Sequence, residues 1–124
     1  MAIITSIALA LMVQGPAQAA ITAVEVGFEE LVANENAAAR QAIESSGEAH
    51  SDDPAILINH GIALARTGNY EAARAKFEAA AGARDSIELE TADGKWVDSR
   101  RLARRAIAML DKGEFARYYA LSMK

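Results

Sequence analysis

The sequence repeats itself after 34 residues. The stretch from Val26, VGFEELVANENAAARQAIESSGEA, aligns without a gap on the stretch from His60, HGIALARTGNYEAARAKFEAAAGA. The aligned pairs include Gly27 with Gly61, Ala38 with Ala72, Ala39 with Ala73, Arg40 with Arg74, Ile43 with Phe77, Glu44 with Glu78 and Ala49 with Ala83. A spacing of this size is typical of arrays in which each unit buries its apolar face by stacking on its neighbours.

Each copy is predicted to contain two helices. In the second copy, Asp52-Asp53-Pro54 is typical of a helix start, and Gly68 is expected to end that first helix. Asn69 is then expected to cap a second helix that runs to about Ala81. On this second helix, the residues at three- and four-residue spacing predict a buried stripe of Tyr70, Ala73, Phe77 and Ala80.

The second copy resembles a tetratricopeptide repeat. The resemblance is carried by Leu57, Gly61, Leu64, Gly68, Tyr70, Ala73, Phe77 and Ala80, and the 34-residue shift equals the period of that family. It implies an all-α, right-handed stack of about three helix pairs whose concave face binds a protein or a peptide. The three repeats are expected at about 20–52, 53–84 and 98–124.

A two-stranded hairpin is expected before the last repeat. LARRAIAMLDKGEF, from Leu102, repeats the order of apolar helix, glycine and aromatic, but its Gly113 lies 11 residues later than the period requires. The extra residues, 86–97, alternate apolar and polar side chains on both sides of Asp93-Gly94, which is a hairpin pattern. An isolated hairpin is marginally stable in water, so we expect Trp96 to anchor it on the helices.

The N-terminal residues 1–19 are typical of a secretory signal peptide. Residues 2–13 are uncharged and mostly apolar, Gly15-Pro16 breaks the run, and Ala17-Gln18-Ala19 offers a cleavage site, although no Lys or Arg precedes the apolar run. The apolar stretch is too short to span a bilayer, which needs roughly 20 residues. The sequence therefore predicts a periplasmic or secreted protein without an integral membrane segment after cleavage. The alternative is that these residues form a buried N-terminal helix.

The composition argues against most kinds of chemistry. The chain has no cysteine, a formal net charge of -4, and no arrangement typical of a metal, phosphate or nucleophile site. A general nucleic-acid binder would normally be basic. His50 and His60 are most simply structural. We therefore expect a non-catalytic protein without a cofactor and with a protein or peptide as its partner.

The candidate binding residues are Asn59, Ile62, Arg66, Arg100 and Arg104. Arg100, Arg101, Arg104 and Arg105 follow Asp98, which is expected to cap their helix, and guanidinium groups bind carboxylates in a bidentate manner. An acidic partner is therefore expected. The tetratricopeptide resemblance adds a partial match to a carboxylate clamp at Asn59, Arg100 and Arg104, although Val24 and Phe28 replace the clamp residues of the first repeat.

Two alternatives to this binding groove remain open. The arginines can be solvated side chains that pair with nearby acids. The chain can also be a small structural subunit of an envelope assembly, which docks through Trp96, Tyr118 and Tyr119.

Overall fold

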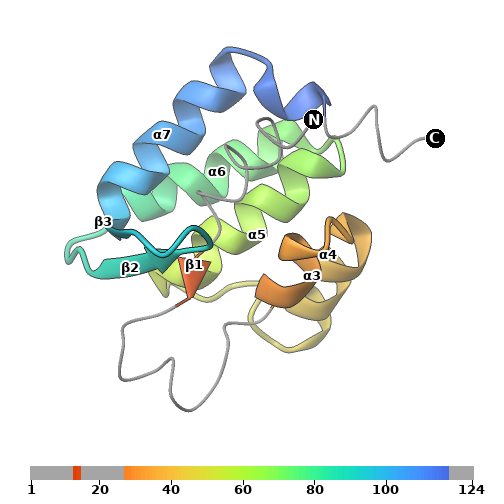
Figure 1. Cartoon of the computed structure of the whole chain (residues 1–124), viewed down its shortest axis with the longest axis horizontal. Helices are drawn as coiled ribbons and strands as arrows, with labels where there is room; N and C mark the ends of the chain where they lie inside the picture. Colours follow the sequence, from red (N-terminus) through yellow and green to blue (C-terminus); the bar gives the residue numbers. More distant parts are fainter. Residues whose placement is uncertain (1–12, 15–26, 118–124) are drawn as a thin grey trace.

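The structure, a computed structural model, describes residues 13–14 and 27–117 and is mainly α-helical (Figure 1). The elements are β1 (Val13–Gln14), α3 (Phe28–Val32), α4 (Asn36–Ser45), α5 (Pro54–Arg66), α6 (Tyr70–Ala81), β2 (Glu88–Thr91), β3 (Trp96–Asp98) and α7 (Ser99–Asp111). The described part of the chain contains no helix that is both long and apolar enough to cross a membrane. The expected signal peptide lies outside the described residues except for Val13 and Gln14.

Helix α5 is the centre of the fold and has the predicted ends. The Asp53 carboxylate accepts a hydrogen bond of 2.9 Å from the Ala55 amide, and Pro54 occupies the first turn. Gly68 takes a φ of 88° after the helix, which allows the Asn69 amide to donate to the Leu64 carbonyl at 2.8 Å. Every residue from Ala55 to Arg66 is buried, as expected for a helix that is packed on all sides.

Helix α6 packs along α5 and supplies Phe77, one of the two phenylalanine rings of the core. The Asn69 side chain accepts from the Ala72 amide, as expected of a cap, and Ala73, Phe77 and Ala80 are fully buried. Tyr70 does not belong to this stripe, because its side chain is 38% exposed. It lies in the first turn of α6, where it lines a hollow of about 310 Å³ together with Leu110 and Phe115.

The first helix pair repeats contacts of the second pair 34 residues earlier. A Cβ atom on Gly61 would meet the Phe77 ring, 2.7 Å from Cδ1, and a Cβ atom on Gly27 would meet Ile43, 2.9 Å from Cδ1. Asn34, which aligns with Gly68, takes a positive φ of 61° in the turn between α3 and α4. The sequence repeat therefore corresponds to a repeated turn and a repeated close approach.

The predicted hairpin is present as β2 and β3, which pair antiparallel with Leu89 opposite Val97. Strand β1 pairs with the other edge of β2, so the sheet order is β1-β2-β3. Leu89 is fully buried and anchors the hairpin, whereas Trp96 is 45% exposed. The expectation that Trp96 is the anchor is wrong, because neighbouring strand residues point to opposite faces and Trp96 pairs with Glu90 on the outer face.

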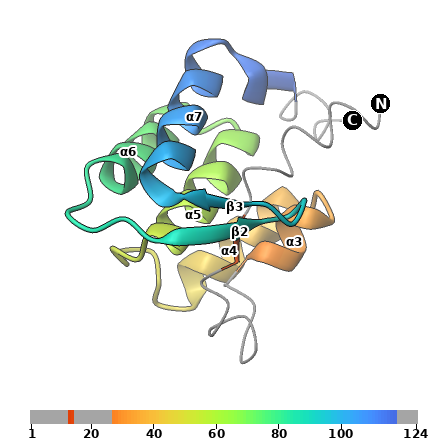
Figure 2. The same cartoon turned by 60° about the vertical axis from the view of Figure 1, so that its left-hand side comes forward.

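Strand β3 leads directly into α7 (Figure 2). The Asp98 side chain accepts from the Arg101 amide and caps the helix, as predicted. Ser99 fastens the hairpin to α7, because its amide donates to the Ile87 carbonyl and its hydroxyl accepts from the Ile87 amide. Beyond α7, Phe115 stacks on Phe77 with ring centroids 6.1 Å apart.

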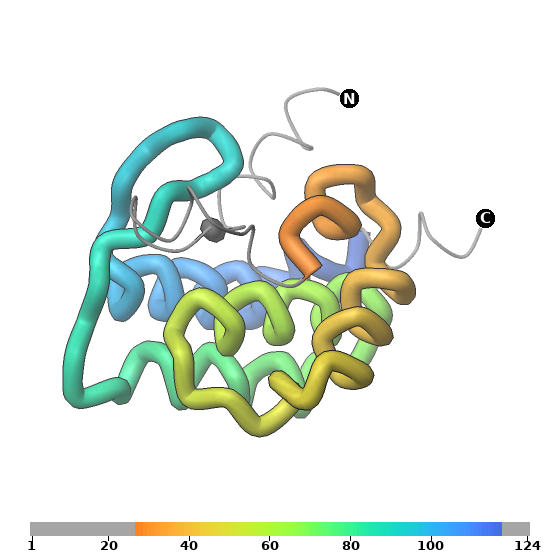
Figure 3. The backbone as a smooth tube through the Cα atoms, turned by 90° about the horizontal axis from the view of Figure 1, so that it is seen from below, coloured from red at the N-terminus to blue at the C-terminus, as the bar shows by residue number. Residues whose placement is uncertain are grey.

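The elements surround α5 unevenly. Figure 3 shows α5 running beside α6 and α7, with the hairpin towards one end and the α3–α4 pair towards the other. Helix α6 contacts both α5 and α7, and α5 also contacts α3, α4, α7 and β1. This arrangement places α7 on the opposite side of α5 from the first helix pair.

Candidate partner-binding surface

Three of the five predicted binding residues lie in the interior. Asn59 and Ile62 are fully buried and Arg66 is 2% exposed. The open groove expected at these residues is therefore not what the structure has. The physical reason is that α5 is covered on every side, by helices α3, α4, α6 and α7 and by strand β1.

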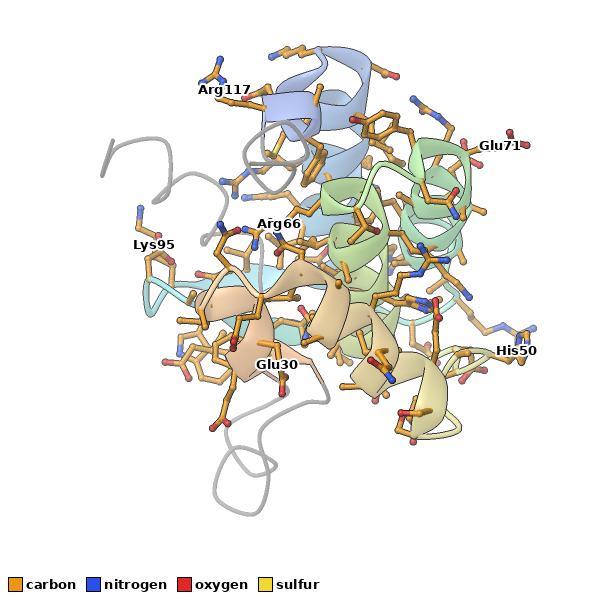
Figure 4. The ribbon with its side chains drawn as sticks, turned by 90° about the vertical axis from the view of Figure 1, so that its right-hand side faces the viewer. Glu30, His50, Arg66, Glu71, Lys95 and Arg117 are labelled. Carbon is orange, nitrogen blue, oxygen red and sulfur yellow. The ribbon has the colours of Figure 1, made fainter. Side chains whose placement is uncertain are left out.

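Arg66 instead links the two helix pairs. Its Nη1 atom donates to the Leu31 carbonyl at 3.0 Å and to the Asn36 Oδ1 atom at 3.1 Å. Leu31 is near the end of α3 and Asn36 begins α4. One guanidinium group thus satisfies polar atoms of both helices of the first pair, and its position beside that pair is visible in Figure 4.

Arg100 is part of the base of the hairpin. It is half-buried, and its Nη2 atom donates to the Ser86 Oγ atom at 3.2 Å. The pKa of the neighbouring Asp98 carboxyl is below its usual value. The larger cause is a hydrogen bond from the Ser86 side chain, and the smaller one is a hydrogen bond from the Arg101 backbone. Arg100 therefore fixes the junction between the hairpin and α7, whereas Arg104 is exposed.

The exposed side of α7 carries Arg101, Arg104 and Arg105, which together are called the arginine face below. The inner side of the helix is the buried stripe of Leu102, Ala103, Ala106 and Met109. None of the three arginines forms an ion pair with another residue of the described ranges, so the expected pairing with nearby acids is not seen there. The sequence prediction chose Arg100 and Arg104 and left out Arg101 and Arg105, although the apolar stripe in the sequence identifies the outer side.

A shallow cleft of about 800 Å³ lies between the start of α5 and the end of α6. Leu57, Ala79 and Ile87 are among its apolar lining residues, and charged groups of both signs also line it. Two of these groups serve the local fold, because Asp53 caps α5 and the Lys76 Nζ atom donates to the Ala49 carbonyl at 2.7 Å. The cleft therefore has no single charge that would select a partner.

His60 is a buried link between α4 and α5. Its side chain is 5% exposed, and its Nε2 atom lies 3.2 Å from the Glu44 Oε2 atom, which also accepts from the Arg40 Nε atom at 2.9 Å. Burial lowers the pKa of His60 below 6.5, and the Lys76 and Arg40 charges act in the same direction, against the hydrogen bond to Glu44. The hydrogen bond from Arg40 lowers the pKa of Glu44. His60 is therefore a structural histidine that burial holds in the neutral form at pH 7.

Acidification is expected to weaken the fold through His60. Its pKa is lower in the folded chain than in the unfolded chain, so the unfolded chain binds more protons as the pH falls below about 6.5. The free energy of unfolding should therefore decrease from pH 7.5 to pH 5.5, as measured by urea unfolding. His60→Gln should flatten this dependence, whereas the control His50→Gln, at an exposed position, should leave it unchanged. An equally steep dependence in His60→Gln would contradict the assignment.

Comparisons with protein-family models, with curated proteins and with solved structures gave no match to this chain. Within residues 13–14 and 27–117, no three His, Asp or Glu side chains gather in a way that could hold a metal ion. The arginine face is accordingly the surface of the described chain with the most distinct chemistry, an exposed cluster of guanidinium groups on a rigid helix.

Proposed function

We propose that this chain is a non-catalytic binding module, built from tetratricopeptide-like helix pairs, that recognises an acidic segment of a protein or peptide. The observation that carries the proposal is the arginine face. Its three guanidinium groups are exposed, and none of them forms an ion pair with a residue of the described ranges. Arginine is well suited to this role, because its planar fork binds carboxylates in a bidentate manner. The chain as a whole is acidic, so an acidic partner should be attracted to this basic face and repelled by much of the remaining surface.

The repeat architecture supports the proposal in a second way. The repeated close approaches at Gly27–Ile43 and Gly61–Phe77 are what stacked helix pairs require, and such stacks are rigid scaffolds that present a face to a partner. A right-handed stack of about three pairs remains our proposal for the complete chain, with the third pair formed by α7 and the residues that follow Gly113. Export to the periplasm or the outside, with removal of residues 1–19, belongs to the same proposal. That removal would take away strand β1 (Val13–Gln14), so the exported form would lack the pairing of β1 with β2 and its contact with α5.

The proposal predicts that reversing charges of the arginine face weakens binding to acidic peptides. A fluorescent octaglutamate peptide should bind the full chain in low salt, and Arg104→Glu/Arg105→Glu should weaken that binding by about tenfold or more, because attraction becomes repulsion. Fluorescence anisotropy measures the affinity. A control for a charge reversal on another helix is Arg74→Glu, because Arg74 lies on α6 and pairs with Asp111 at the C-terminal end of α7.

Two results would decide against an acidic protein partner. Equal binding by the wild type and the reversed variant would remove the arginine face from the site. Tighter binding of a single-stranded oligonucleotide than of the peptide, with the same loss in the variant, would point to nucleic acid instead.

A second function is favoured by the exposure of Trp96. A large aromatic side chain that is 45% exposed on the outer face of a hairpin is a frequent anchor of protein interfaces. The chain would then be a structural subunit that docks through Trp96, together with Tyr118 and Tyr119, which lie outside the described residues. Trp96→Ser separates the two functions, since it should leave octaglutamate binding unchanged and abolish association with an envelope assembly.

A further inference from the structure

The two ends of the described chain carry opposite charge. Residues 99–117, which contain α7, hold six basic and two acidic residues, a net charge of +4. Residues 27–49, which contain α3 and α4, hold five acidic residues and one basic residue, a net charge of -4. The chain thus provides, on one molecule, a basic segment and an acidic segment of equal and opposite net charge.

These two surfaces cannot meet within one copy. Helix α5 lies between them, with α7 on one side and the first helix pair on the other (Figure 1). Figure 4 shows the same separation, because Glu30 on the first pair and Arg117 beyond α7 lie at opposite ends of the molecule. Any pairing of the two surfaces therefore has to join different copies.

The charges on the first pair are available for such a contact. Glu29 and Glu35 are exposed, and neither forms an ion pair within the described ranges. Val32, between them in the sequence, is 43% exposed and adds an apolar contact surface to the acidic one. The arginine face opposite is equally unpaired among the described residues.

We infer that the acidic partner of the arginine face is the α3–α4 pair of a second copy of this chain. This inference rests on the proposed function and names its partner. Repulsion between like charges opposes contact between the α7 helices of two copies and contact between their α3–α4 pairs. The charges therefore favour a head-to-tail arrangement, in which α7 of one copy meets the α3–α4 pair of the next. Head-to-tail contacts leave one surface of each kind free, so the assembly can grow beyond a dimer.

The association depends on screening by salt. Contacts between exposed charges are individually weak and are screened over about 10 Å at 0.1 M salt. Sedimentation velocity of the full chain should show species that grow with protein concentration at about 20 mM salt and a monomer at about 500 mM salt. A monomer at both salt concentrations, over the whole accessible concentration range, would overturn the inference.

Charge reversal tests the two surfaces separately. Arg104→Glu/Arg105→Glu and Glu29→Lys/Glu35→Lys should each weaken self-association by about tenfold or more, because each replaces attraction by repulsion. An equimolar mixture of the two variants should associate again, because each reversed surface finds its complement on the other variant. The matched control Glu71→Lys/Glu78→Lys changes the net charge equally on the exposed side of α6 and should still self-associate.

The outcomes separate this inference from the proposed function. A monomeric wild type that still binds octaglutamate through the arginine face would overturn the second copy as partner and leave the binding function standing. A wild type that neither self-associates nor binds octaglutamate would overturn both. Self-association that survives both reversals, or a mixture that stays monomeric, would assign the contact to other surfaces and overturn the inference.

Discussion

Gly61→Ala is expected to destabilise the protein, although the same exchange in an ordinary helix is stabilising. Alanine in place of glycine inside a helix usually gains about 1 kcal/mol. Here the new methyl group would lie 2.7 Å from Phe77 Cδ1 and 2.9 Å from Cζ. The Phe77 ring is fully buried and stacked on Phe115, so it has no space to move into.

The net result should be a free energy of unfolding lower by about 1–3 kcal/mol, the usual cost of overpacking a core. Thermal unfolding followed by circular dichroism should show a Tm lower by about 4–8 °C for each kcal/mol. Phe77→Leu provides the internal control, because the smaller side chain should make Gly61→Ala cost less in the double variant than alone. A Gly61→Ala protein with a higher Tm than the wild type would mean that α5 and α6 do not approach as closely as described.

Arg66→Met is expected to have an effect of similar or larger size, confined to the first helix pair. The exchange keeps an unbranched side chain as far as the Nε position but removes the rest of the guanidinium group and both hydrogen bonds of Nη1, so the Leu31 carbonyl and the Asn36 side chain lose a donor in the interior. A buried polar group that loses its only hydrogen-bond partner costs about 1–3 kcal/mol. The Leu31 carbonyl keeps the hydrogen bond from the Asn34 amide, so the Asn36 side chain should carry most of this cost. The first pair should therefore detach from α5 at a lower free energy than the rest of the fold.

Hydrogen exchange measures this local effect directly. The amides of α3 and α4 should exchange faster in Arg66→Met, and those of α6 and α7 should change less. Arg74→Met is the matched control, because Arg74 is 38% exposed and its ion pair with Asp111 should contribute less than about 1 kcal/mol. Equal effects of the two exchanges would show that Arg66 does not hold the first pair in place.

Local signals in the sequence were sufficient for both ends of α5 and α6, for the start of α7 and for the hairpin. Asp53, Asn69 and Asp98 all cap helices as predicted, since a cap depends only on residues within one turn. The alternation around Asp93-Gly94 likewise predicted β2 and β3, because strand pairing across a tight turn is a local property.

The errors concern which side of an element is covered. Tyr70 lies in the first turn of α6, as predicted, but the exposure of its side chain depends on where α7 ends beside it. Asn59 and Ile62 lie on the predicted helix, yet they are buried because other elements close over α5. Residues 55–65 are apolar on nearly all sides of the helix, which is typical of a buried helix, and the predicted groove did not take this into account. The arginine face is different, because the spacing of Leu102, Ala106 and Met109 in the sequence is enough to place the three arginines on the outer side of α7, and the prediction did not use it.

The turn of the hairpin is a suitable site for inserting a label. Asp93, Gly94 and Lys95 are exposed at its tip, while Leu89 and Ser99 hold its base to the helices. Lengthening a flexible loop costs only about 0.6 kcal/mol for each doubling of its length, and exposed tips are where insertions are best tolerated. A fluorophore or an affinity tag inserted between Gly94 and Lys95 would therefore report on the folded protein while leaving the repeat and its arginines untouched.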